Sequence, residues 1–409
     1  MEPTKPKERL IEIDVLRGVA VLGMVLWDFG SHSMGNYYVA GAIDRLAYRI
    51  VDIIDINNTI HLIFAFLFGW GMAMPMLRSK AKGEPFVGLE LRRLLALFIL
   101  GAANCILVDR SDFLYLLAMA GAVALLFANR SNRTLLSSAV LLIAVPVLSK
   151  FIFSRVLSPE SFSALFGVHA ASFASLNPQY VLSASYGGLV LMRAHELLGD
   201  LAHPLSFIWI MDMVVMFLFG FYAARRNVFR DISSNIRFIR KVLWCSLAVR
   251  LLALGSGFAL QKLEIPEKGA TLGLATTWGI VGDLVKSYSP QAFALFYICL
   301  VVVLLQNNML KRMSRPVADV GQLALSNYFL HDLIGTTLFF GYGLALHGKL
   351  GYGLGKGLAV LSCVFLLVIS SWWTRRFQFG PAEWLWRCAT YWRFPRFRRP
   401  PSESKAVAA

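Results

Sequence analysis

The sequence predicts an all-α protein, a polytopic membrane bundle of about ten transmembrane helices. Of its 409 residues, 57% are hydrophobic and only 16% are charged. This composition is too apolar for a soluble protein of this length. Apolar runs of about 17 to 22 residues, the length that a membrane helix needs, recur along the chain. Basic residues cluster in every second connection between these runs, which favours a multi-pass topology.

The apolar runs give ten expected spans. They lie at about 13–31, 57–77, 91–108, 112–128, 134–153, 206–224, 239–260, 290–306, 321–341 and 354–373. Arginine and lysine gather after the second, fourth, sixth and eighth runs and again after the tenth. By the positive-inside rule, both termini are expected in the cytoplasm. Residues 1–373 are therefore predicted to form a transmembrane bundle.

The formal net charge of +16 would suggest nucleic acid as the partner of a soluble protein. Here the basic residues lie between apolar runs, so the expected partner is the lipid bilayer and no nucleic acid. Residues 374–409 mix tryptophan, phenylalanine and arginine. This mixture favours a cytoplasmic tail at the membrane surface. The five cysteines lack paired spacing, and no metal site is expected.

Two segments form a weak internal repeat. FLFGWGMA in the run 57–77 is similar to FLFGFYAA in the run 206–224. In this alignment His61 falls on Asp212, so each copy has one ionisable residue at the same depth. Paired helices related by internal symmetry often line a central site in membrane proteins, which makes both residues candidates. A neutral histidine that is hydrogen-bonded to another span is the alternative for His61.

The first span carries an ionisable stripe. Asp14, Arg17, Asp28 and His32 all lie within about 60° of one line on a helix, so this face should turn away from lipid. Asp14 and Arg17 form either an ion pair that locks the helix end or one wall of a substrate site. Asp28 and His32 form either a general base or a hydrated pair. Spans two, six and nine are the expected neighbours of this face.

The ninth span contains four polar side chains on two adjacent stripes. Asn327 and His331 are four residues apart, as are Tyr328 and Asp332. For acyl transfer, a histidine would act as the base and Asn or Tyr would donate to the oxyanion. A transporter would use the same groups in a proton-coupled site.

Five segments together resemble the YeiB-like family of bacterial inner-membrane proteins, which carry a domain of unknown function. The segments are IDVLRGVAVLGM, FAFLFGWGMA, DFLYLLAMAG, GQLALSNYFLHD and the closing WWTRRFQFGPAEWLWRCATYW. In layout these proteins are distantly similar to transmembrane acyltransferases that use acyl-CoA. The resemblance implies a multi-pass protein of the bacterial inner membrane.

Together, the resemblance and the polar residues suggest transfer of an acyl group from acyl-CoA to a small hydroxyl or amine acceptor. A small-molecule transporter or exporter with a proton-coupled site is the alternative. Acyl-CoA would be a co-substrate, and no bound cofactor is expected. The catalytic candidates are His331, His61 and Asp332. The candidates for substrate binding are Asp14, Arg17, Asp28, His32, Asp212, Asn327 and Tyr328.

Overall fold

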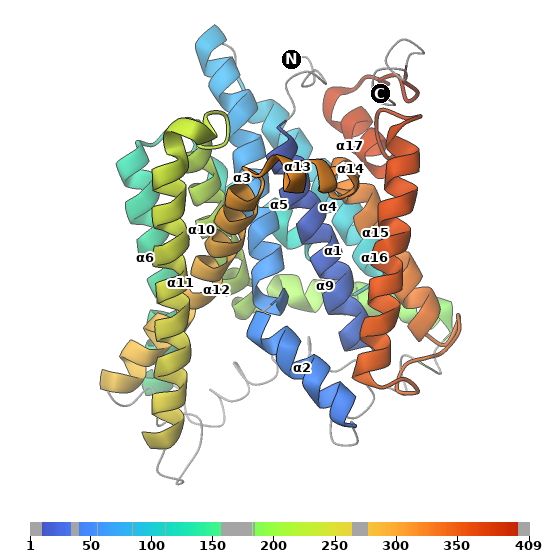
Figure 1. Ribbon diagram of the computed structural model, residues 1–409, viewed down its shortest axis with the longest axis horizontal. Helices are drawn as coiled ribbons and strands as arrows, with labels where there is room; N and C mark the ends of the chain where they lie inside the picture. Colours follow the sequence, from blue (N-terminus) through green and yellow to red (C-terminus); the bar gives the residue numbers. More distant parts are fainter. Residues whose placement is uncertain are drawn as a thin grey trace.

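The computed structural model describes residues 10–33, 41–54, 56–83, 85–110, 112–156, 182, 185–263 and 277–399. Within these ranges the named elements are all helices (Figure 1). They are α1 (Ile11–Ser33), α2 (Ala42–Ile54), α3 (Ile56–Lys82), α4 (Val87–Leu107), α5 (Leu114–Leu125), α6 (Asn132–Val156), α9 (Tyr186–Ala202), α10 (Pro204–Arg225), α11 (Ile232–Leu263), α12 (Thr277–Leu304), α13 (Asn308–Met313), α14 (Arg315–Gln322), α15 (Ala324–Phe339), α16 (Tyr352–Thr374) and α17 (Pro381–Tyr391).

The predicted all-α class is confirmed. Among the described residues, three helical segments are long and apolar enough to cross a membrane: Thr59–Lys82, Ser206–Arg225 and Tyr352–Thr374. Shorter apolar segments lie in α5, α6 and α12. The count of ten spans stays a prediction, as does the side of the membrane on which the termini lie. The start of α1 and the helix α17 do lie at the same end of the molecule (Figure 1).

Helix α1 runs through the middle of the bundle, between α3 and α16 (Figure 1). Its ionisable stripe faces inward, because Asp14, Asp28 and His32 are all buried. The main neighbours of α1 are α14, α16, α3 and α15. The expected neighbour α10 instead packs mainly on α3, α6 and α5. Close approach of α14 requires glycine, since a Cβ on Gly321 would overlap the carbonyl oxygen of Asp14.

The two segments of the weak repeat lie against each other, because α3 and α10 form one of the most extensive helix contacts in the fold. A Cβ on Gly69 would overlap the carbonyl oxygen of Phe217, and a Cβ on Gly220 would overlap that of Phe66. The contact is therefore reciprocal, with each glycine seated on the backbone of the other segment. Small residues allow helix backbones this close approach inside a membrane, where packing replaces the hydrophobic driving force.

The predicted ninth span at 321–341 is not one helix. The chain leaves helical geometry at Leu323, which separates α14 from α15. The side chain of Glu383 on α17 satisfies the first backbone N–H groups of α15. Its Oε1 accepts from Leu325 N at 2.7 Å and from Ser326 N at 3.1 Å, and its Oε2 accepts from the Ser326 hydroxyl. The free N–H groups at a helix start need such acceptors, so α17 fixes where α15 begins.

We expect Gly69→Ala to lower the free energy of unfolding by about 1–3 kcal/mol, because the new methyl group meets a backbone carbonyl rather than a flexible side chain. Gly71→Ala is the matched control, since the nearest atom to its Cβ is Arg17 Nη2 at 3.9 Å. Thermal unfolding in detergent measures both variants. Equal melting temperatures for the two would contradict the glycine contact.

We expect Glu383→Ala to cost about 1–2 kcal/mol of stability by removing the cap of α15. Glu383→Gln should retain most of it, because one amide oxygen can accept both backbone N–H groups. Burial raises the pKa of Glu383 above 4.5, and the Ser326 hydrogen bonds oppose this shift. The folded chain therefore binds this proton more readily than the unfolded chain, so lowering the pH toward 4.5 should stabilise wild type relative to Glu383→Gln. Chemical denaturation at several pH values tests the sign.

Candidate functional site

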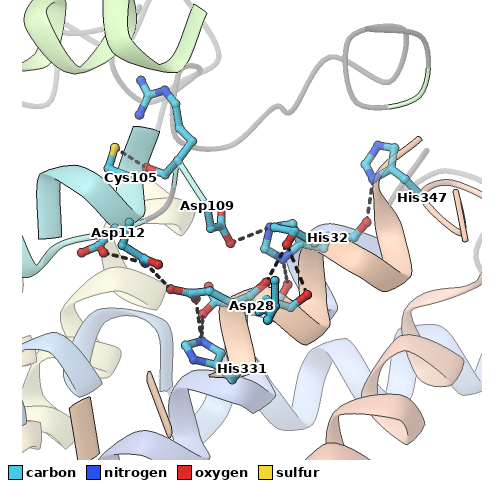
Figure 2. Close-up of polar contacts among 12 residues, drawn as sticks. Asp28, His32, Cys105, Asp109, Asp112, His331 and His347 are labelled. Atoms are coloured by element: carbon cyan, nitrogen blue, oxygen red, sulfur yellow. Dashed lines mark hydrogen bonds and ion pairs between the residues drawn. The ribbon is translucent and has the colours of Figure 1, made fainter. Parts of the chain in front are cut away.

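An acid–histidine cluster lies buried where α1, α4, the α4–α5 turn and α15 meet (Figure 2). We define it as Asp28, His32, Asn104, Asp109, Asp112, His331 and Asp332, and each of these residues is at most 5% exposed. Intramembrane groups of this kind must pair with one another, because lipid offers them no hydrogen bonds. The cluster therefore holds three separate parts of the chain in one arrangement: α1, the end of α4 with the following turn, and α15.

His331 is the centre of the cluster. Its Nδ1 contacts the carbonyl oxygen of Tyr328, and its Nε2 lies 2.8 Å from Asp28 Oδ2 and 3.1 Å from Asp332 Oδ1. A carbonyl oxygen can only accept a hydrogen bond, so Nδ1 carries a hydrogen. The Nε2 atom then faces two carboxylates, and a proton must lie between the imidazole and its nearer partner. Asp28, His331 and Asp332 thus share a proton, as the groups of an acid–base site do.

The predicted side-chain pair between Asp28 and His32 does not form. His32 Nδ1 instead contacts the backbone oxygen of Asp28 at 2.7 Å, and its Nε2 lies 3.2 Å from Asp109 Oδ2. The Asp28 carboxylate is drawn to His331 on another helix. Because His32 reaches the carbonyl one turn back, its ring points toward the α4–α5 turn and away from the Asp28 carboxylate (Figure 2).

Asn104 joins two carboxylates. Its Nδ2 donates to Asp112 Oδ2 at 2.7 Å and to Asp332 Oδ2 at 2.5 Å. The other oxygen of Asp112 accepts from Leu114 N at 2.6 Å, which caps the start of α5. Asn104, Asp109 and Asp112 are not among the site residues predicted from the sequence. The available signal for the two acids is their place in a short turn between two apolar runs.

The cluster contains four carboxylates and two imidazoles. Arg110, the nearest arginine in sequence, turns away and pairs with Glu196 and Asp200 on α9. Full ionisation would leave excess negative charge in the interior, which is costly, so neighbouring groups share protons. One oxygen or nitrogen from each of Asp28, His331 and Asp332 also lies within 4.8 Å of the others, close enough for these residues to hold a metal ion.

A second feature, the arginine cavity, lies next to the cluster. It has a volume of about 250 Å³ and is walled by α1, α3, α4, α14, α15 and α17. Its charged lining residues are Asp14, Arg17, Arg78, Arg93, Arg230, Glu383 and Arg387. Five arginines therefore face two carboxylates. Aromatic rings of Phe64, Phe68, Trp70, Trp386 and Tyr391 complete much of the wall.

Tyr328 separates the cavity from the cluster. Its side chain is one of the cavity walls, and its ring centre lies 5.2 Å from that of His331. Leu114, the residue whose N–H binds Asp112, lines the cavity as well. A molecule at the inner end of the cavity would therefore be one side chain away from the proton-sharing groups.

The remaining sequence candidates lie in three places. Asp14 and Arg17 form a 3.4 Å ion pair and line the arginine cavity, and their role in substrate binding stays a prediction. Asn327 points away from His331 and donates to Val320 O at 3.1 Å and to Ser370 Oγ at 2.8 Å. His61 stacks on Trp209, while Asp212 accepts from Gln291 at 3.0 Å. Neither His61 nor Asp212 is part of the cluster.

Two further polar residues adjoin the cluster. His347, in the connection before α16, contacts the backbone oxygen of His32 at 2.6 Å through Nδ1. Burial lowers the pKa of His347, which favours its neutral form. Lys356 on α16 donates to the carbonyl oxygen of Leu26 and lies over the Tyr352 ring. These contacts fix the end of α1 that carries Asp28 and His32.

The fold and the site define an all-helical membrane protein with a buried acid–histidine centre. The sequence model described as "Protein of unknown function (DUF418)" matches residues 223–393. The model of the heparan-alpha-glucosaminide N-acetyltransferase catalytic domain matches residues 9–192. The first match covers α15, and the second covers α1, α4 and the α4–α5 turn. The acid–histidine cluster therefore lies where the two matched regions meet in space.

Three bacterial proteins are similar to the chain over nearly its whole length. "Uncharacterized protein YxaH" of Bacillus subtilis (strain 168) is 28% identical, with 96% of each chain covered. An "Uncharacterized 39.9 kDa protein in amylase 3'region" of Bacillus acidopullulyticus is 24% identical, also with 96% of each covered. "Uncharacterized protein YeiB" of Escherichia coli (strain K12) is 26% identical, with 94% of this chain and 96% of YeiB covered. The resemblance to the YeiB-like family is thus confirmed.

We expect a double-mutant cycle between Asp28→Asn and His331→Gln to give a coupling free energy of about 1–3 kcal/mol, because the two groups share a proton in a buried contact. The control cycle pairs Asp28→Asn with Asn327→Ala, one turn from His331 on α15, whose amide bonds Val320 O and Ser370 Oγ and not the cluster. It should give coupling within about 0.5 kcal/mol of zero. Unfolding in denaturant measures both cycles, and equal coupling in the two would argue against the direct contact.

Proposed function

We propose that the protein is a membrane acyltransferase that moves an acyl group from acyl-CoA to a small hydroxyl or amine acceptor. The observation that carries this proposal is that the arginine cavity and the acid–histidine cluster are adjacent, with only the Tyr328 side chain between them. A phosphate-rich donor with a thioester at its far end suits such an arrangement. The similarity of residues 9–192 to an N-acetyltransferase catalytic domain supports the same reaction class.

The arginine cavity would hold the donor. Guanidinium groups match phosphate oxygens in charge and geometry, and five arginines line this cavity. The indole rings of Trp70 and Trp386 offer flat surfaces for a nucleobase. The basic loops favour a cytoplasmic location for the end of the bundle at which the arginine cavity lies. Acyl-CoA is available on that side of the bacterial inner membrane.

His331 would act as the general base. The acceptor oxygen or nitrogen attacks the thioester carbonyl carbon, and its proton passes to the group formed by Asp28, His331 and Asp332. The carbon–sulfur bond then breaks, and the CoA thiolate leaves and takes up a proton. Contact between His331 Nδ1 and the Tyr328 carbonyl fixes the ring, so that Nε2 is the nitrogen that exchanges protons. Tyr328, between the cavity and the base, would border the acyl group.

A proton-coupled transporter is the second candidate function. The observation that favours it is the run of buried proton-sharing groups from Asp109 and His32 to Asp28, His331 and Asp332. Such acid–histidine chains are typical of proton pathways in membrane transporters. Proteoliposomes that contain a pH-sensitive dye distinguish the two functions. A transporter would acidify or alkalinise the lumen when substrate is added, whereas an acyltransferase would release a free thiol.

We expect acetyl-CoA or a longer acyl-CoA to raise the melting temperature of the purified protein. Replacing Arg78, Arg230 and Arg387 by glutamine should weaken that binding by more than about tenfold, because three phosphate-binding charges are lost. Arg133→Gln, at an exposed position on α6, is the matched control. Thermal shift over a range of thioester concentrations gives the apparent affinities.

His331→Gln should bind the thioester as wild type does and lose thiol release with a panel of hydroxyl and amine acceptors. A loss of both binding and release would mean that the fold has failed rather than the base. Absence of stabilisation by every acyl-CoA and by CoA itself would contradict the proposed donor site.

A further inference from the structure

The segment after α16 folds back on the end of that helix. Phe377 and Arg398 form an antiparallel bridge, and Gln378 N donates to Phe397 O at 3.0 Å. The Trp384 indole donates to Pro395 O at 2.9 Å. Rings of Trp373, Phe377 and Phe397 pack together inside this turn. We call residues 375–399 the C-terminal hook, and its own contacts hold it in one shape.

Two aromatic side chains of the hook project outward. Trp392 is 80% exposed and Phe394 is 84% exposed, more than any other large hydrophobic side chain in the described ranges. Water around rings of this size is unfavourable, so an exposed aromatic pair on a fixed support indicates a contact surface. Three exposed arginines accompany the two rings: Arg393 lies between them in the sequence, and Arg396 and Arg398 follow Phe394.

Helix α16 sets the level of the membrane beside this surface. It is apolar enough to span, and one flank of it is exposed: Leu354, Val360, Leu361, Val364, Phe365, Val368 and Trp372. Trp372 lies in its last turn, and the Arg376 guanidinium lies 4.5 Å from the Trp372 ring centre. Tryptophan and arginine at a helix end mark the headgroup region. The hook is tied to Phe377, just beyond Thr374, so it lies at this level.

We propose that residues 392–398 bind anionic lipid headgroups of the membrane that α16 crosses. Trp392 and Phe394 enter the interface between headgroups and acyl chains, and the three arginines contact lipid phosphates. Aromatic rings favour this interfacial depth. Each basic residue near an anionic membrane surface raises the constant for membrane binding about fivefold. Residues 392–398 thus combine positive charge for lipid phosphates with aromatic rings for the acyl-chain boundary. This inference does not depend on the acyltransferase proposal.

Quenching of tryptophan by brominated lipid tests the proposal on the full-length protein. The protein is placed in liposomes of one composition, phosphatidylcholine with about a quarter phosphatidylglycerol. Bromine near the top of the acyl chain is carried either by the phosphatidylglycerol or by an equal amount of the phosphatidylcholine. The difference between wild type and Trp392→Phe isolates the signal of Trp392 from the other tryptophans.

We expect brominated phosphatidylglycerol to quench Trp392 at least about twofold more than brominated phosphatidylcholine. Replacing Arg393, Arg396 and Arg398 by glutamine should remove this preference while Trp392 stays quenched by both lipids. Arg133→Gln should leave the preference unchanged. Equal quenching of wild type by the two lipids would overturn the anionic preference. Absence of any quenching of Trp392 would overturn lipid contact altogether and would leave a protein partner as the occupant of the surface.

Discussion

The contact between Asp28 on α1 and His331 on α15 joins positions 303 residues apart and is the interaction on which the interior depends. Each group stabilises the other in the apolar interior, because an uncompensated buried charge is strongly destabilising. Several packing features serve this contact. Glycine lets α14 approach α1, and the break at Leu323 lets α15 take its own direction. The helix α15 is thus positioned at its start and in its middle.

Two regions of opposite electrostatic character lie back to back in this protein. The arginine cavity has an excess of positive charge, whereas the acid–histidine cluster has an excess of carboxylates. Tyr328 is the thin partition between them, and it is almost fully buried. Because charge interactions strengthen where water is excluded, an anionic molecule in the cavity and a proton in the cluster would each influence the other. This juxtaposition is a property of the tertiary fold and of no single helix.

Local sequence patterns predicted the features that depend on neighbouring residues alone. The lengths of the apolar runs predicted the positions of most helices. The spacing of Asp14, Asp28 and His32 correctly predicted which face of α1 is buried. Contacts between segments that are distant in the sequence could not be predicted from local patterns. Asn327 shares a stripe with His331, yet its amide bonds the Val320 carbonyl near the helix break and so leaves the site. Asn104, Asp109 and Asp112 acquire their importance only when α4 meets α15, because nothing in their own segment specifies that partner.

Helix α17 has a consequence for how the protein is made. It supplies one wall of the arginine cavity, and through Glu383 it holds the first turn of α15. Chains are synthesised from the N-terminus, so α15 leaves the ribosome before the helix that caps it. The start of α15 therefore lacks its cap until α17 has been made and has folded back. A nascent chain that stalls after α16 would carry most of the described helices and still lack this cap and one wall of the arginine cavity.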